Sequence, residues 1–207
     1  MEVSVSNYDR MAAQARTRFL TFDQEAIIKT FRLRHDDSQI YLDFVSREYR
    51  ICRTDGQIIY SQNGRDMAAG FHEVLSICDM LCHGNEYPVL SGTWESISSL
   101  GGIIGAGHSN SSLMEQSKAP FAGKVRELTQ ACRMLGGSPM KNGDVSFLLP
   151  VFDFFPTWFQ FWDGDEEYPP SIRFLWDKHT LRYLHYETLW YIINHILERL
   201  KEAMESK

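Results

Sequence analysis

The sequence predicts a single α+β domain in which antiparallel groups of strands are flanked by helices. Segments with strand periodicity cluster together, segments with helical periodicity separate them, and 207 residues suffice for one core. We expect one domain over residues 1–207 with three parts. These are a helix plus a small meander at 1–66, a mainly helical part at 67–144, and an aromatic hairpin plus a C-terminal helix at 145–207.

The first part begins with helices and continues with strands. The Ala- and Arg-rich segment 8–19 predicts a helix, and Asp23 stands as the N-cap residue before a second, short one. From Ile40 onward apolar residues recur at every second position, and Asp55-Gly56 is a tight-turn signal within this region. The pattern predicts a small antiparallel meander.

The middle part is expected to be mainly helical. Apolar residues from Met67 to His83 recur at helical spacing, and Gly84 ends that segment. A second helix is expected from about residue 121 to 135, closed by Gly136-Gly137. Between the two we interpret 93–100 as helical and the glycine-rich segment that follows it as a loop.

The last part predicts an aromatic hairpin covered by a helix. Alternation around Phe159 and Phe174 predicts two strands that are joined by residues 163–170. A helix is expected from about Glu187, because apolar residues recur at three- and four-residue intervals. We expect this helix to pack on the hairpin by one side only, through Trp190, Ile193, Leu197 and Leu200.

Charge and composition exclude several classes of protein. A formal net charge of −6 argues against a nucleic-acid binder and against an anionic membrane surface as partner. No secretory signal and no apolar run long enough to span a bilayer is present. The four scattered cysteines are typical of reduced thiols. These observations predict a cytoplasmic protein.

The segment from Trp162 to Tyr168 is the first candidate for a binding site. Between its two terminal aromatic residues lie four carboxylates, Asp163, Asp165, Glu166 and Glu167. Such oxygen ligands suit Ca²⁺ or Mg²⁺, and crowding of carboxylates raises at least one pKa, as a general acid requires. We expect Trp162 and Tyr168 to wall a pocket whose rim carries Asp165 and Glu166, the candidate metal ligands. The alternative is a solvated turn.

Cys78 and Cys82 lie one helical turn apart and are a second candidate, as ligands of one metal ion. Their spacing matches neither C-x-x-C nor a ferredoxin run, so a closed site would need donors from other elements. The available donors are Cys52, Cys132, His35 and His108. Both cysteines fall on the apolar face of the predicted helix, which favours buried, unmodified thiols.

The glycine-rich segment that starts at Gly101-Gly102 is a third candidate, because consecutive glycines let backbone N–H groups approach an anion. The G-x-G-x-x-G spacing after a strand and the Walker lysine are both missing. A plain loop is therefore the favoured interpretation.

Several motifs together carry a resemblance to a known family. The acidic segment 162–170, Trp176-Asp177 and Tyr183-Leu184 with Glu187 are accompanied by the earlier landmarks 88–94, Gly101-Gly102 and Gly136-Gly137. With these the chain resembles the prokaryotic family called domain of unknown function 3786, from about Tyr8 to Leu200. We add Trp94, Gly101 and Gly102, which belong to these landmarks, to the ligand-binding candidates.

The resemblance implies a link to redox or metallocofactor metabolism, since some members of that family carry an iron–sulfur module. Our interpretation is an accessory or ligand-binding domain that recognises a small ligand or a metalloprotein partner. No nucleophile–base pair is recognisable, whereas acidic and aromatic groups converge at one hairpin. The alternative is an enzyme that uses Asp163, Asp165, Glu166 and Glu167 as acid/base groups or as ligands of a divalent metal. The sequence indicates neither a particular cofactor nor an oligomeric state.

Overall fold

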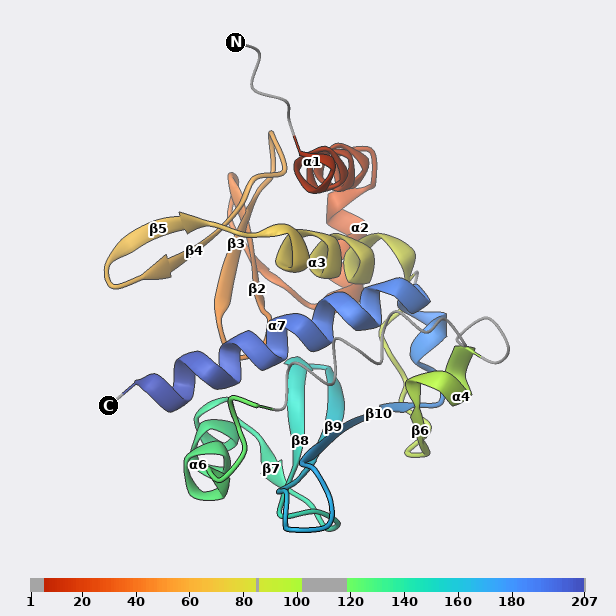
Figure 1. Cartoon of the computed structure of the whole chain (residues 1–207). Helices are drawn as coiled ribbons and strands as arrows, with labels where there is room; N and C mark the ends of the chain where they lie inside the picture. The colour runs from red at the N-terminus through yellow and green to blue at the C-terminus, as the bar shows by residue number, and fades with distance from the viewer. Residues whose placement is uncertain (1–5, 85, 102–118, 207) are drawn as a thin grey trace.

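Two antiparallel sheets form the frame of this α+β domain, in a computed structural model that describes residues 6–84, 86–101 and 119–206 (Figure 1). The N-terminal sheet is a meander in the order β1 (Arg34–His35), β2 (Gln39–Asp43), β3 (Glu48–Cys52), β4 (Ile58–Gln62), β5 (Arg65–Ala68). The C-terminal sheet has the order β6 (Trp94–Ser96), β10 (Ser171–Asp177), β9 (Phe155–Trp162), β8 (Val145–Phe152), β7 (Ser138–Pro139).

The helices lie around and between these sheets. They are α1 (Asn7–Phe19), α2 (Gln24–Phe31), α3 (Phe71–His83), α4 (Ile97–Gly101), α6 (Val125–Met134) and α7 (Tyr186–Glu205), with a short 3₁₀ turn at Thr180–Arg182. Figure 1 shows α7 crossing the middle of the molecule, with α3 and the N-terminal sheet on one side and α6 and the C-terminal sheet on the other. Among the described helices, none has the length and apolar content that a membrane span requires.

Local signals explain most of the helix ends. The carboxylate of Asp23 accepts the N–H of Ala26 at 3.1 Å and caps α2, as predicted. Gly136, with φ +71°, lies just beyond the end of α6, and a Cβ on Gly137 would come within 2.7 Å of the Cys132 carbonyl oxygen. Both glycines of this pair are therefore required by the backbone.

The predicted meander and the predicted aromatic hairpin are confirmed. In the meander, Ile40 pairs with Ile51 and Ile51 with Ile58, so the apolar residues share one face. In the hairpin, Phe161 pairs with Ile172, and residues 163–170 connect β9 to β10. The two sheets are joined where the N–H of Val45 donates to the Val151 carbonyl at 2.8 Å.

Two expected helical segments are partly strands. Met67 belongs to β5, where it pairs with Tyr60, and α3 starts only at Phe71. Trp94–Ser96 is strand β6 on the edge of the C-terminal sheet, and only the following residues form α4. In both cases a neighbouring strand supplies backbone hydrogen bonds that local periodicity does not report.

Helix α7 is buried along one side, as expected, but the buried arc is wider than predicted. Buried positions occur around more than half of its circumference, while Trp190, expected in the core, is only half-buried. The buried residues are Thr188, Leu189, Ile192, Ile193, His195, Ile196, Leu197, Leu200 and Ala203. The reason is that α7 packs between α3 and α6 and thus between the two halves of the fold.

A buried polar network ties α7 to the N-terminal half. Tyr49 of β3 donates its hydroxyl to Glu73 Oε1 of α3 at 2.5 Å, and the same hydroxyl lies 3.3 Å from His195 Nε2 of α7. Arg47 Nη1 lies 3.8 Å from Glu73 Oε1, and the N–H of Gly70 donates to Glu73 Oε2. His195 is 2% exposed, so burial, together with the charges of Arg199, Arg47 and His72, lowers its pKa to about 3.

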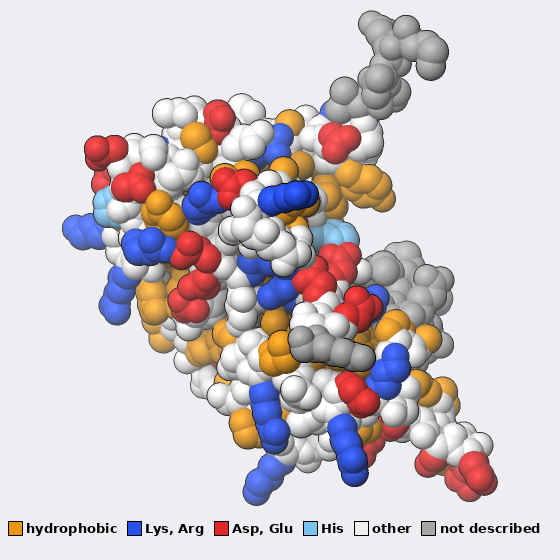
Figure 2. All heavy atoms as spheres, turned by 90° about the vertical axis from the view of Figure 1, so that its left-hand side faces the viewer, with side chains coloured by type: hydrophobic (Ala, Val, Ile, Leu, Met, Phe, Trp, Pro, Cys, Tyr) orange, Lys and Arg blue, Asp and Glu red, His pale blue; other side chains and the backbone are white. Residues whose placement is uncertain are grey.

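Charges of both signs are mixed on the outer face of the N-terminal half. Figure 2 shows basic and acidic side chains interspersed on the face toward which the β4–β5 hairpin points. In the N-terminal sheet Arg34 pairs with Glu48, and Arg50 pairs with Asp66. Ion pairs near the surface contribute little stability, and both of these lie within the N-terminal sheet.

The lowered pKa of His195 predicts acid-sensitive stability. His195 stays neutral in the folded state, whereas its unfolded pKa is near 6.5, so only the unfolded state gains the proton as pH falls below that value. The free energy of unfolding should drop by up to about 1.4 kcal/mol per pH unit from this residue. Urea unfolding at several pH values between neutral and mildly acidic measures the slope.

His195→Gln should flatten that slope, and the exposed control His35→Gln should leave it unchanged. Slopes rather than absolute stabilities are compared, because His195 also stacks on Phe44 at 4.7 Å between ring centroids. An equal slope in wild type and His195→Gln would show that this histidine is not the group that titrates.

Candidate metal centre

The acidic tip after β9 uses two of its carboxylates to build its own turn. Asp163 accepts the N–H of Gly123 at 2.9 Å, which ties the tip to the segment before α6. Asp165 Oδ1 accepts the N–H groups of Glu167 and Tyr168 at 2.9 and 2.7 Å. These backbone hydrogen bonds lower the pKa of Asp165, so crowding does not raise it.

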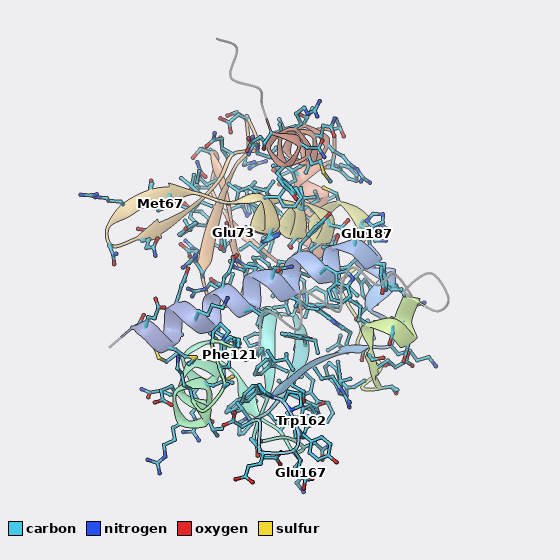
Figure 3. The ribbon with its side chains drawn as sticks, viewed as in Figure 1. Met67, Glu73, Phe121, Trp162, Glu167 and Glu187 are labelled. Atoms are coloured by element: carbon cyan, nitrogen blue, oxygen red, sulfur yellow. The ribbon has the colours of Figure 1, made fainter. Side chains whose placement is uncertain are left out.

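The remaining residues of the tip face solvent or pack on a neighbouring strand. Glu166 and Glu167 are exposed, Tyr168 is 69% exposed, and half-buried Trp162 lies under the Arg173 guanidinium, 5.3 Å from its ring centroid. Figure 3 shows Trp162 and Glu167 at the end of the C-terminal sheet that lies away from Glu187. The tip thus has the geometry of a solvated turn, so the pocket expected between Trp162 and Tyr168 was wrong, and the pocket described below has another lining.

The other sequence candidates lie apart from the tip. Trp94 opens β6 opposite Asp177 and meets Trp158 edge-on at 6.3 Å between ring centroids. Gly101 is the last residue of α4, and Gly102 lies outside the described residues, as does His108.

The family-like motifs at 88–94 and 176–184 converge on one buried carboxylate. Asp177 accepts the N–H groups of Ser91 and Gly92 at 3.0 and 2.8 Å, the Ser91 hydroxyl at 3.0 Å and the N–H of His179 at 2.9 Å. Burial raises the pKa of Asp177, but these hydrogen bonds outweigh it and the net shift is downward. With its lone pairs occupied in this way, Asp177 has a structural role.

Cys78 and Cys82 are buried and reduced, as expected for structural thiols. Cys78 is 5% exposed and Cys82 is 7% exposed, and burial raises the pKa of each thiol to about 12. Neither is a thiolate at neutral pH. Cys78 is followed in the sequence by Asp79, and Cys82 is followed by His83. Asp79 and His83 belong to a cluster of possible metal ligands.

Asp79, His83 and His185 form this cluster. Asp79 and His83 are four residues apart on α3 and so share one helix face, while His185 is the residue at which α7 begins. One ligand atom from each side chain lies within 4.8 Å of the others. Asp79 and His83 are half-buried and His185 is exposed, so the cluster opens to solvent on one side.

Hydrogen bonds hold the cluster in place. Asp79 Oδ1 lies 2.5 Å from His185 Nδ1, and Asp79 Oδ2 accepts the His185 N–H at 2.9 Å and the Thr188 hydroxyl at 2.6 Å. The Asp79 carboxylate therefore accepts hydrogen bonds from two donors at the start of α7. The side chain of His185, the N-cap residue, does not cap this helix. The centroids of the His83 and His185 rings are 3.9 Å apart. Burial and then the neighbouring His185 lower the pKa of His83.

A pocket of about 290 Å³ adjoins the cluster between α1, α3 and α7. Asp79, His185 and Thr188 form its polar part, and Arg18 and Glu187 carry its other charges. Its apolar wall consists of Met11, Ala15, Leu75, Cys78, Cys82 and Tyr191. Figure 3 places Glu187 at the start of α7, beside the last turn of α3.

Two imidazoles and one carboxylate are a donor set that binds Zn²⁺ or Fe²⁺. Ligand atoms around tetrahedral Zn²⁺ are about 3.3 Å apart, given bonds of about 2.0–2.1 Å. The Asp79–His185 pair, at 2.5 Å, would have to open by less than one ångström, and exposed His185 has room to move. An ion held by these donors would replace the hydrogen bond between Asp79 and His185.

The candidates taken from the sequence did not include the Asp79–His83–His185 cluster. The signal was the spacing Asp79-x-x-x-His83, the carboxylate counterpart of the two cysteines one position earlier. The third member is more than 100 residues away in sequence, and only the packing of α7 on α3 brings it near.

Comparison with known proteins gives one match. The model of the family described as Domain of unknown function (DUF3786) matches residues 23–199. The chain belongs to this family. No curated protein and no solved structure matches. The matched region of this DUF3786 domain contains the whole Asp79–His83–His185 cluster, whereas α1, with Arg18, precedes it.

Because Asp177 is buried, its replacement by asparagine should lower the stability of the fold markedly. Asp177→Asn replaces one acceptor oxygen by an amide group that faces N–H donors, so the free energy of unfolding should fall by about 2–3 kcal/mol. The exposed control Asp165→Asn, which also serves a turn, should have a clearly smaller effect. Urea unfolding of both variants tests this, and equal losses would contradict a central role for Asp177.

Proposed function

We propose that this DUF3786 domain is an accessory or ligand-binding domain that holds a divalent transition metal ion, Zn²⁺ or Fe²⁺, through Asp79, His83 and His185. The observation that carries the proposal is the meeting of three suitable donors from two helices within 4.8 Å, at the edge of a pocket. Sites with three protein ligands leave a coordination position for a small molecule, in contrast to closed structural sites.

The protonation state of His83 supports metal binding. Its pKa is lowered from the ordinary value of 6.5, so the ring is neutral at neutral pH and a nitrogen lone pair is available. Within the described residues His83 forms no hydrogen bond that competes for that lone pair. The His83 ring packs against the His185 ring, so His83 lies as a third donor beside the hydrogen-bonded Asp79–His185 pair.

A metal centre also suits the expected place of the domain in metallocofactor metabolism. A metal-binding accessory domain meets a metalloprotein partner or a metal-bound small ligand through an ion that is exposed on one side. The exposure of His185 supports this arrangement, since an ion held there faces solvent rather than the core.

His83 offers the cleanest test of the metal site, because its loss removes a donor without removing a hydrogen bond of the described fold. Wild-type protein should bind one equivalent of Co²⁺, whose visible absorption reports coordination by nitrogen and oxygen. His83→Gln should weaken this binding by more than the roughly 10- to 100-fold that loss of an outer-shell partner costs. Wild type, but not the variant, should gain thermal stability with added Zn²⁺.

Two control variants separate this site from other donors. His35→Gln removes an exposed histidine of β1, and Asp165→Asn removes a carboxylate of the acidic tip. Both should bind Co²⁺ as the wild type does. If Asp165→Asn alone abolished binding, the metal ligands would lie at the tip, and if wild type bound no metal, the proposal would fail.

An enzyme is the second candidate, and the 2.5 Å contact between Asp79 and His185 favours it. A carboxylate that holds Nδ1 of an imidazole leaves Nε2 to take a proton, as in hydrolases with a His–Asp pair. In this version the acid/base groups are Asp79 and His185 rather than the carboxylates of the tip. Hydrolysis of an activated ester by metal-free protein, lost in His185→Gln and retained in His83→Gln, would favour the enzyme over the metal centre.

A further inference from the structure

We infer that the ligand of the metal centre is a small organic monocarboxylate, bound through its acid group by Arg18 and through its apolar body by the wall of the pocket. The inference rests on the proposed function, because the acid group approaches the open side of the Asp79–His83–His185 cluster. The inference extends the proposed function by naming the class of ligand. It also assigns a role in ligand recognition to α1, which precedes the region matched by the family model.

Arg18 is placed to meet an anion beside the cluster. It lies in the last turn of α1 and lines the same pocket as Asp79 and His185. Cys82 of α3 lines that pocket as well, so the pocket brings Arg18 to the helix that carries Asp79 and His83.

Within the described residues, the Arg18 guanidinium lies on an aromatic ring instead of a carboxylate. Among the described residues no carboxylate forms an ion pair with it, and its guanidinium carbon lies 5.7 Å from the Phe22 ring centroid. By contrast, Arg47 and Arg53 pair with glutamates that join separate elements. A guanidinium on an aromatic ring keeps its N–H groups in a plane that matches a carboxylate.

The rest of the lining selects an apolar body with a single negative charge. Cys78 and Cys82 are buried and form apolar surface beside Met11, Ala15 and Leu75. Glu187 lies in the lining as well and repels a second anionic group. The volume of about 290 Å³ is at the small end of ligand pockets, so the ligand is small.

Benzoate is a suitable probe because it combines one carboxylate with a compact apolar body. Titrated into the Co²⁺-loaded full chain, benzoate should change the visible spectrum of the ion, and benzyl alcohol, which lacks the charge, should not. Arg18→Gln should weaken benzoate binding about tenfold, the expected loss for a charge-assisted hydrogen bond, and should not weaken the binding of Co²⁺.

The matched control is Arg10→Gln, which removes the same charge from the same helix at a residue that bonds Asn7 instead of lining the pocket. Arg10→Gln should bind benzoate as the wild type does. Failure of the wild type to bind Co²⁺ would overturn the proposed metal centre. Normal Co²⁺ binding with no response to benzoate, or an equal response in wild type and Arg18→Gln, would overturn the present inference alone.

Discussion

The fold depends on the buried carboxylate of Glu73, which joins three elements at one point. Its two oxygens accept hydrogen bonds from Tyr49 of β3 and from the N–H of Gly70 ahead of α3, and Arg47 and His195 lie beside it. A buried charge is tolerated only when it is fully hydrogen-bonded, so these partners must stay in place together. Through His195 the network contributes to the position of α7 beside α3, and that position brings His185 to Asp79 and His83, the residues of the proposed metal centre.

Asp79 makes the equivalent connection at the other end of the α3–α7 pair. The same carboxylate that satisfies backbone and hydroxyl donors at the start of α7 also contacts the imidazole of His185. Asp79 therefore has a structural role and is also a proposed metal ligand. Its hydrogen bonds to the first residues of α7 fix the orientation of its carboxylate before an ion binds, and a metal ligand benefits from such support.

The local elements of the fold were predictable, because their signals lie within a few residues of one another. Asp23 caps α2, Gly136-Gly137 follows α6, and the aromatic alternation around Phe159 forms a hairpin. Strand β6 and the β5 position of Met67 were missed because each is decided by a partner strand. The buried circumference of α7 was underestimated because periodicity reports an apolar stripe, not the number of layers that cover it.

By itself, the sequence determined the fold class, the family-like motifs and the burial of Cys78 and Cys82, whereas the pocket expected at Trp162–Tyr168 was wrong. Only the tertiary structure decided which polar residues meet. The acidic tip drew attention because its carboxylates are consecutive, yet its backbone occupies two of them. Asp79 and His185 are distant in sequence, and no local sequence pattern marks either residue. They form a site because α7 packs across α3, and that packing is set by the sum of buried contacts on both of its sides rather than by a local pattern.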